Sequence, residues 1–340
     1  MNLLVTGGLG YIGSHTVKAL YDHGHKAVIV DDCSNAKETV HGHLETLVNA
    51  AIPFYRQDVK DETAMNAIFE AHTFDGVLHF AGYKAVGESV EKPLKYYQNN
   101  LNTTMTLMNL CLEHRVDKVI FSSSATVYGE QDSPLHEGLA LKVTTNPYGE
   151  TKAVSERILK DIQKAHPTLG VTLLRYFNPV GADDSGLIGE DPHGIPNNLM
   201  PFITKVAAGT LDKLQIFGQD YPTSDGTGVR DYIHVSDLAR GHVLAIEQLT
   251  PGTHIYNLGT GQGTSVLEMV KAFEAVNQVS VPYVFAPRRA GDVAVTYAAV
   301  DKAKEALNFV TEKTLEDMVR DSWRFTLNQK RISVKDRGLD

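Results

Sequence analysis

The sequence predicts an α/β fold: a doubly wound, Rossmann-type parallel sheet followed by a smaller mixed α/β domain. Short apolar runs alternate with longer amphipathic stretches, the runs are almost continuously apolar, and a glycine-rich turn follows the first of them. Strands buried on both faces have such runs, and crossover helices between parallel strands produce the alternation. The length of 340 residues corresponds to about two domains of roughly 150 residues.

The first half of the chain contains six apolar runs that we predict to be strands. They are Asn2–Thr6, Lys26–Asp31, Phe54–Gln57, Gly76–Phe80, Lys118–Ser122 and Val171–Phe177. Between them, apolar residues at three- and four-residue spacing indicate helices that cover the sheet. These helices are Ile12–His23, Asp61–Ala71, Pro93–Arg115 and Pro147–His166. Gly24 directly follows the first helix and is expected to end it.

The character of the sequence changes at residue 178, so we divide the chain into a first domain (1–177) and a second (178–340). Residues 178–230 are rich in Gly, Pro, Asn and Asp and contain one clear amphipathic stretch, Leu199–Gly209. A segment near 231–262 is expected to return to the first domain.

Further elements are predicted in the remainder of the chain. They are helices at Asp237–Leu249, Leu267–Ala275 and Leu315–Leu327, and a strand at Ile255–Leu258. The last residues, Gln329–Asp340, are polar and aperiodic. We therefore expect this terminal segment to fray.

Charge and composition argue against several classes of protein. The chain carries 32 Lys and Arg against 41 Asp and Glu, a formal net charge of −9, whereas general binders of nucleic acid or anionic membranes need a basic face. No apolar run approaches the ~20 residues of a membrane span, and the N-terminus lacks the basic start of a signal peptide. Cys33 and Cys111 are too few for a disulfide framework. We expect a cytoplasmic protein without nucleic-acid or membrane partners.

The turn from Gly7 to Gly13 (GGLGYIG) joins the first strand to the first helix. Glycine accepts positive φ and lets the backbone approach a pyrophosphate, while the helix N-terminus offers free N–H groups. Gly7, Gly10 and Gly13 are therefore candidate dinucleotide-binding residues. Asp31 ends the second strand, where a carboxylate binds the ribose hydroxyls and repels a 2′-phosphate. This favours NAD over NADP.

Tyr148 and Lys152 lie four residues apart at the start of a predicted helix, with Asn146 as N-cap and Pro147 at the first helical position. They share one helix face, but Tyr and Lys are frequent enough for this spacing to arise by chance, so the context decides. Lowering the pKa of a phenol from ~10 to neutrality takes about 4 kcal/mol. One positive charge ~4 Å away supplies about that much. Lys152 or an oxidised nicotinamide ring would thus make Tyr148 a general base toward a sugar hydroxyl.

A serine-rich segment, Phe121–Gly129, follows the fifth predicted strand. Its hydroxyls are expected at the carboxyl end of the sheet, where ligands of doubly wound folds bind. One of them could relay a proton between substrate and Tyr148. In isolation, serines that only cap a turn would explain the segment equally well.

Together, the glycine turn, the serine segment and Tyr148-x-x-x-Lys152 resemble the extended short-chain dehydrogenase/reductase superfamily. Longer stretches narrow the resemblance to its UDP-glucose (UDP-galactose) 4-epimerase family, over almost the whole chain up to about residue 327. The matching stretches are Leu4–His15, His79–Pro93, Phe121–Gly129, Leu174–Gly181, Gly189–Pro201, Gly226–Asp237 and Ala286–Asp292.

The resemblance implies a hydride shuttle with a retained NAD. Tyr148 would take the proton of the sugar 4-hydroxyl, assisted by Ser124, while the C4 hydride moves to NAD. The 4-keto sugar would rotate and take the hydride back on its other face. Lys152 would lower the pKa of Tyr148 and bind the nicotinamide ribose.

The resemblance also assigns ligand-binding residues. Around NAD it places Gly7, Gly10, Tyr11, Ile12, Gly13, Asp31, Asn35, Asp58, Val59, Phe80, Ala81, Lys84, Asn99, Ser122, Tyr148, Lys152 and Phe177. In the UDP-sugar pocket it places Ser124, Tyr148, Asn178, Asn197, Asn198, Leu199, Gln215, Phe217, Arg230, Tyr232, Arg289, Asp292 and Thr296. The chemistry agrees, because arginine offers a forked, permanently charged donor to a diphosphate.

Thr296 matches the position that gates the sugar pocket in the family. A bulky tyrosine there is associated with plain hexoses, and a small residue with N-acetylated ones. The family resemblance therefore implies activity on UDP-N-acetylglucosamine and UDP-N-acetylgalactosamine besides UDP-glucose and UDP-galactose. It also implies a homodimer, in which helices Pro93–Arg115 and Pro147–His166 pair across a two-fold axis.

Competing interpretations are less well supported. A 4,6-dehydratase needs a carboxylate pair beside the serine segment, where this chain has Ala125, Thr126 and Val127. Epimerases of UDP-glucuronate or UDP-xylose match the pocket segments less well. A non-enzymatic NAD-binding sensor would be expected to lack Tyr148, Lys152 or Ser124, and all three are present. No metal site is expected, because the 14 histidines show no ligand spacing.

Overall fold

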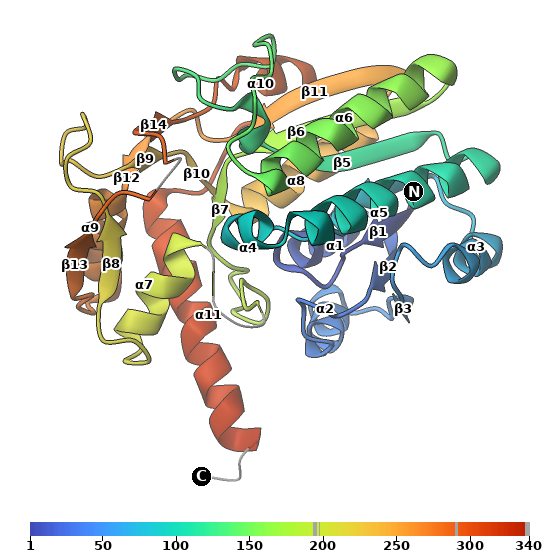
Figure 1. The fold of residues 1–340 in the computed structure, drawn as a ribbon. Coiled ribbons are helices and arrows are strands. Elements are labelled where there is room, and N and C mark those ends of the chain that lie inside the picture. The colour runs from blue at the N-terminus through green and yellow to red at the C-terminus, as the bar shows by residue number, and fades with distance from the viewer. Residues whose placement is uncertain (193–195, 197, 290–291, 337–340) are drawn as a thin grey trace.

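A seven-stranded sheet forms the centre of the protein, whose computed structural model describes residues 1–192, 196, 198–289 and 292–336, with the backbone alone for 331–336. The strand order is β11-β6-β5-β4-β1-β2-β3, and all neighbours are parallel (Figure 1). The strands are β1 (Asn2–Thr6), β2 (Lys26–Asp31), β3 (Phe54–Arg56), β4 (Gly76–His79), β5 (Lys118–Ser124), β6 (Gly170–Tyr176) and β11 (Gly252–Leu258). The predicted doubly wound fold is thereby confirmed. The order reverses between β1 and β4, where such folds bind ligands.

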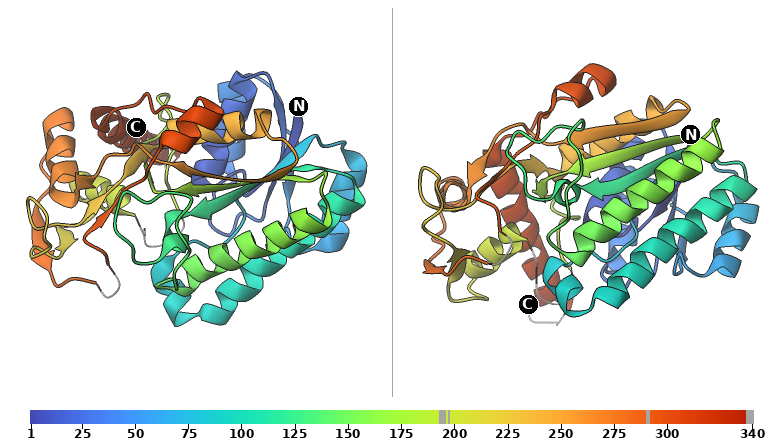
Figure 2. Two further views of the ribbon diagram at one scale, coloured as in Figure 1. Left: turned by 90° about the horizontal axis from the view of Figure 1, so that it is seen from above. Right: turned by 45° about the horizontal axis from the view of Figure 1, so that its top comes forward.

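Helices cover both faces of this sheet (Figure 2). One face carries α1 (Tyr11–Asp22), α2 (Thr39–Val48) and α8 (Val235–Glu247), and the other α3 (Glu62–Ala71), α5 (Pro93–Glu113) and α6 (Pro147–Ala165). Side chains of β1 alternate between the two cores, since Leu3 and Val5 join the first and Leu4 the second. Among the helices of the described residues, none is both long and apolar enough to cross a membrane.

Two helices of the first region were not predicted from the sequence. In α2 Leu44 is buried and Val40, Leu47 and Val48 pack partly buried against the same core, a helical spacing that was the available signal. The short helix α4 (Val86–Glu91) has six residues, too few for a periodic pattern. The predicted strands and helices of this region otherwise end within about two residues of the observed bounds, which is the usual uncertainty of helix and strand ends.

After β6 the chain builds a smaller mixed region with its own apolar core. Its strands form small sheets, namely β7 (Asn178–Val180) with β10 (Tyr232–His234), β9 (Val229–Arg230) with β12 (Thr264–Ser265) and β14 (Val295–Thr296), and β8 (Leu214–Phe217) with β13 (Tyr283–Ala286). The helices of this core are α7 (Leu199–Ala207), α9 (Val266–Asn277) and α11 (Leu315–Asp336).

One segment returns from the smaller region to the central sheet. β11 pairs with β6 from Gly252 opposite Gly170 to Leu258 opposite Tyr176, and α8 packs against α1. Both elements lie in or near the part of the chain, residues 231–262, for which a return was predicted. The helix α10 (Asp301–Leu307) then adds Ala303 and Leu307 to the core beside α8.

The prediction that Gln329–Asp340 frays is wrong for the part that the structure describes. Helix α11 continues to Asp336. Its preceding turns are fixed because Met318 and Val319 are buried in the smaller core, and Lys330 Nζ donates a hydrogen bond to the carbonyl of Ala208 at 2.6 Å. Tertiary contacts of the preceding turns therefore stabilise the helix through this polar stretch. The local sequence pattern does not show these contacts.

Candidate active site

Two cavities contain most of the predicted site residues. The first, of about 340 Å³, is lined by residues that follow β1, β2 and β4 and by residues of β5, β6 and α6. The second, of about 430 Å³, lies in the smaller region. Tyr176, the last residue of β6, lines the first cavity, and Asn178, two residues later, lines the second. The chain between β6 and β7 therefore connects them.

The glycine turn has the backbone geometry that a bound pyrophosphate needs. Gly7 has φ 70°, and a Cβ there would lie 2.8 Å from the amide nitrogen of Ala81. A Cβ on Gly13 would lie 2.2 Å from the carbonyl oxygen of Gly7. Gly10 caps α1 without a side-chain hydrogen bond, so the first helical N–H groups are left to a ligand. The cradle fits an anionic group.

Asp31 stands at the end of β2 and lines the first cavity. Its two carboxylate oxygens accept hydrogen bonds from the backbone N–H groups of Leu9, at 3.0 Å, and Cys33, at 2.9 Å. Burial raises the pKa of Asp31, and these hydrogen bonds oppose the rise. A carboxylate fixed in this way is suited to ribose hydroxyls and repels an extra phosphate. The residues present therefore fit NAD.

The structure brings almost all predicted cofactor residues to the first cavity. Its lining includes Gly7, Gly10, Tyr11, Ile12, Gly13, Asp31, Asn35, Asp58, Val59, Phe80, Ala81, Lys84, Asn99, Ser122, Tyr148 and Lys152. Phe177 is the predicted cofactor residue that does not line this cavity. It belongs to a separate buried cluster with Val127, Tyr128 and Leu135.

Tyr148 lies in the first turn of α6, where Asn146 accepts the hydrogen bond of the Gly149 N–H at 2.9 Å as N-cap. Burial raises the pKa of Tyr148 to about 12, while a hydrogen bond with Ser124 opposes the rise. Ser124 ends β5 and also binds Thr126, whose hydroxyl donates to it at 3.0 Å. The expected pair of Tyr148 and Ser124 is therefore in contact.

Lys152 is buried and lies one helical turn after Tyr148. Its ammonium group donates to the carbonyl oxygen of Ser122 at 2.5 Å and lies 4.9 Å from the centre of the Phe121 ring. Burial lowers the pKa of Lys152 to about 8. A lowering of the Tyr148 pKa by Lys152 stays a prediction, because burial of the phenol and the hydrogen bond with Ser124 are the influences on this pKa in the protein alone.

Glu156 continues the same helix face one turn further, and the sequence analysis overlooked it. Ser123, between the two predicted site serines, donates its hydroxyl to Glu156 at 2.7 Å. Arg175 of β6 binds the same carboxylate through Nε, at 2.8 Å, and Nη2, at 2.5 Å. This buried group ties the end of β5 to α6 and β6. The repeated four-residue spacing of Tyr148, Lys152 and Glu156 was the available signal.

The second cavity contains most of the predicted substrate residues. Its lining includes Asn178, Asn198, Leu199, Gln215, Phe217, Arg230, Tyr232, Arg289 and Asp292. Arg289 Nε donates to Asp292 at 2.9 Å, and its guanidinium group lies 4.9 Å from the centre of the Phe217 ring. Arg230 and Arg289 therefore give the cavity a cationic wall beside an aromatic ring, a combination suited to a phosphorylated base.

Four predicted substrate residues lie elsewhere or cannot be placed. Tyr148 lines the first cavity, and Ser124 contacts Tyr148. Thr296 lies in β14 opposite Arg230 of β9 and is not among the residues lining the second cavity. Asn197 lies outside the described residues.

Lining residues that the sequence did not reveal include Tyr176 and Lys213. The Tyr176 hydroxyl bonds to Ser122, and burial raises its pKa. Its place at the end of a predicted strand was the available signal. Lys213 adds a third cation to the second cavity from an irregular segment before β8, where no pattern marked it.

Comparison with known proteins places this geometry in context. Residues 3–259 match the model of the "NAD dependent epimerase/dehydratase family". The chain is 52% identical over 328 residues to the UDP-glucose 4-epimerase of Bacillus subtilis (strain 168), covering 96% of each chain.

Two solved structures are also similar over nearly the whole chain. UDP-glucose 4-epimerase from Bifidobacterium longum, in complex with NAD+ and UDP, is 47% identical with a TM-score of 0.94, covering 97% of this chain and 99% of that one. The UDP-Glc/GlcNAc 4-epimerase from Campylobacter jejuni is 36% identical with a TM-score of 0.84, and the match covers 96% of this chain and 99% of that one.

Proposed function

Because the chain belongs to the NAD dependent epimerase/dehydratase family, we propose that it is a UDP-glucose 4-epimerase, which interconverts UDP-glucose and UDP-galactose through a 4-keto sugar. The observation that carries the proposal is that the two cavities are lined from almost adjacent positions of the chain, Tyr176 and Asn178. Tyr148 and Lys152 line the cavity with the glycine turn, and the second cavity has a cationic wall suited to UDP. A sugar attached to UDP in the second cavity would reach toward Tyr148 in the first.

In this mechanism the side chains of α6 and β5 handle the proton of the sugar 4-hydroxyl. Tyr148 accepts that proton, and its hydrogen bond with Ser124 orients the phenol. NAD+, which the glycine turn and Asp31 would hold, would supply the acceptor for the hydride of sugar C4 together with a positive charge. Arg230 and Arg289 hold the diphosphate, so that the sugar turns while the nucleotide stays bound. Tyr148 then returns the proton to O4 of the turned 4-keto sugar while the hydride would return to the other face of C4, which gives the other epimer and leaves the cofactor oxidised.

The raised pKa of Tyr148 shows how much positive charge this step needs. Moving a pKa of about 12 to neutrality requires about 7 kcal/mol. One unit charge ~4 Å away supplies about 4 kcal/mol at an effective dielectric constant of ~20. Lys152 alone therefore falls short, and two cations near the phenol are sufficient.

The direct test is to incubate purified protein with UDP-galactose without added NAD. We expect UDP-glucose to form, because the bound NAD is regenerated in each cycle and the cavity retains it. Product is measured by chromatography of the UDP-sugars. Absence of product both with and without added NAD would contradict the proposed activity.

We also expect turnover of UDP-N-acetylgalactosamine, because Thr296 is small. The Thr296→Tyr variant should lose most of this activity while it keeps the activity on UDP-galactose, since a larger ring at the gate excludes the acetyl group. Both rates are measured on the same preparations. If wild type does not convert the acetylated sugar, or if Thr296→Tyr slows both sugars equally, the role of Thr296 as the gate is wrong.

Domain organisation and assembly belong to the same proposal. Residues 1–177 would bind NAD and residues 178–340 the UDP-sugar, with β11 and α8 returned to the first domain. A homodimer is supported by apolar side chains on α4 and α5, where Val90 is 61% and Leu94 71% exposed. α5 and α6 lie side by side (Figures 1 and 2), so they offer one continuous face to a second copy. A cytoplasmic location stays a prediction.

A further inference from the structure

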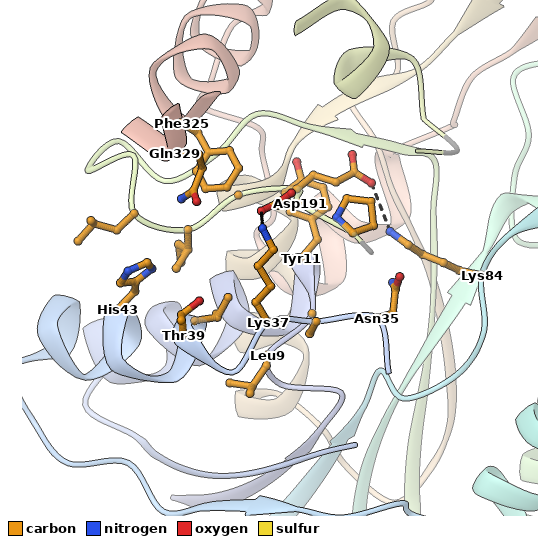
Figure 3. A pocket seen from close by; sticks show the side chains of 18 residues that line it. Leu9, Tyr11, Asn35, Lys37, Thr39, His43, Lys84, Asp191, Phe325 and Gln329 are labelled. Carbon is orange, nitrogen blue, oxygen red and sulfur yellow. Dashed lines mark hydrogen bonds and ion pairs between the residues drawn. The ribbon is translucent and has the colours of Figure 1, made fainter. Parts of the chain in front are cut away.

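The segment from Leu187 to Pro192, between β7 and α7, reaches the first cavity at Pro192. We call it the strap. It lines a small neighbouring pocket of about 40 Å³ (Figure 3). Gly10, Tyr11, Asn35, Ala36, Lys84 and Pro192 line both this pocket and the first cavity. The strap therefore forms a wall beside the cofactor residues, on the side where Asn35 and Lys84 lie.

Two ion pairs join the strap to the NAD-binding region. Lys37, in the segment between β2 and α2, binds Asp191. Lys84 Nζ lies 3.3 Å from Oε1 of Glu190. Figure 3 shows Lys37 extending toward Asp191 and Lys84 approaching from another side of the pocket. The strap is thus attached through charged side chains that flank the cofactor cavity.

The backbone of the strap is also held in place by packing against neighbouring residues. Ile188 is 1% exposed and belongs to the core that contains Leu9 and Ala36. Gly189 packs closely against the ring of Phe325 in α11, since a Cβ on Gly189 would lie 2.6 Å from this ring. The strap can therefore hold its place beside the cofactor cavity without contributing a large side chain to it.

Glu190 connects the strap to the second cavity as well. The oxygen that pairs with Lys84 also accepts a hydrogen bond from Asn198 Nδ2 at 2.6 Å. Asn198 precedes α7 and lines the second cavity, whereas Lys84 lines the first. The Glu190 side chain is only 9% exposed, so little water competes for this oxygen. One carboxylate oxygen thus links a cofactor-side cation with a substrate-side amide.

We propose that the strap retains NAD and that Glu190 is a positioning residue which makes this retention depend on occupancy of the substrate cavity. A nucleotide diphosphate that engages Asn198 would hold its amide in place, and Asn198 would hold Glu190 on Lys84. By reciprocity, bound NAD would favour the same arrangement. The inference takes the identity of the cofactor from the proposed function, but its test does not use turnover.

Loss of NAD is the measurement. NAD-loaded wild type, Glu190→Gln and Asp191→Asn are dialysed against NAD-free buffer, and nucleotide per chain is followed over time after acid release. We expect about ten-fold faster loss from Glu190→Gln, since a charge-assisted contact is removed. A smaller increase of up to about five-fold is expected from Asp191→Asn, whose ion pair is half-exposed. Glu305→Gln and Asp132→Asn, both exposed, are matched controls.

Two further comparisons distinguish an effect of the strap on NAD retention from a general loss of stability of the fold. Lys37→Met combined with Asp191→Asn should lose NAD no faster than Asp191→Asn alone, because both remove one contact. UDP at saturating concentration should slow the loss in wild type, but not in Glu190→Ala, which lacks the shared oxygen.

Each comparison has a result that overturns its part of the inference. Wild-type rates of loss in both Glu190→Gln and Asp191→Asn would exclude retention by the strap. Additive effects of the Lys37 and Asp191 changes would exclude their pairing. Equal slowing by UDP in wild type and Glu190→Ala would exclude the link through Glu190. Failure of wild type to convert UDP-galactose would instead concern the proposed function, so the two failures are distinguishable.

Discussion

Replacement of Tyr148 by Phe is expected to lower kcat for UDP-galactose by about 10²- to 10⁴-fold, the usual contribution of a positioned general acid or base. The phenol is the acid–base group that we propose for the reaction; it lines the cofactor cavity, and a hydrogen bond with Ser124 acts to lower its pKa. Phenylalanine keeps the ring and its packing but cannot accept the proton. Steady-state rates with UDP-galactose give the size of the effect.

The same variant should keep its bound NAD, which separates a chemical role from a role in cofactor binding. The glycine turn and Asp31 are untouched, and they make the contacts that fit the dinucleotide. Tyr283→Phe is the matched control, because Tyr283 lies exposed on β13. Near-normal turnover in Tyr148→Phe, at full NAD content, would show that another group is the base.

The sequence was sufficient for those parts of the site that local pattern determines. The glycine turn, the carboxylate of Asp31 and the Tyr148–Lys152 pair each depend on residues close together in the chain. Their positions at strand ends follow from the parallel sheet. The substrate residues depended on the family resemblance instead, since Arg230 and Arg289 come from separate loops and no periodicity places them together.

The remaining features depend on contacts between distant segments. Phe177 directly follows a strand that leads to the cofactor cavity, yet its ring packs with Val127 and Tyr128. No local sequence pattern predicts the contact between Glu190 and Lys84, because 106 residues separate them. The pKa of Tyr148 was expected to fall on the evidence of a neighbouring lysine. In the protein alone it is raised by burial of the phenol, which depends on the whole fold.

The net charge of −9 is compatible with two anionic ligands because positively charged groups lie at both sites. In the first cavity they are the N-terminus of α1 and three lysines, which stand among four carboxylates, and the lysines are Lys84, Lys95 and Lys152. In the second they are Arg230, Arg289 and Lys213. A surplus of acid elsewhere excludes a general polyanion binder without weakening either site.

A second large effect is expected at the buried pair of Glu156 and Arg175, which supports the serine segment. Both side chains are almost inaccessible, at 0% and 1% exposure. Glu156→Gln should lower the free energy of unfolding by about 3–5 kcal/mol at pH 7, because it leaves the guanidinium group buried without a counter-charge. Urea unfolding followed by circular dichroism measures the loss, with the exposed Glu305→Gln as control, expected within about 0.5 kcal/mol of wild type.

The difference in stability between wild type and Glu156→Gln should depend on pH, and the pKa of Glu156 decides in which direction. Burial acts to raise the pKa of Glu156, but the hydrogen bonds and charge of Arg175 and the Ser123 hydroxyl bring it below its ordinary value. The carboxylate therefore stabilises the fold above the unfolded pKa of ~4.3, and this contribution is lost as the pH falls through the lower folded value. The gap between wild type and Glu156→Gln should narrow in that acidic range.

A double variant distinguishes a strong ion pair from a costly unpaired charge. Glu156→Leu with Arg175→Met removes both charges, and we expect it to regain most of the stability that Glu156→Gln loses. It also leaves the Ser123 hydroxyl without its acceptor, so kcat should stay below that of wild type even where the fold is restored. Wild-type stability in Glu156→Gln, or full activity in the double variant, would contradict a role for this pair in holding the end of β5 against α6.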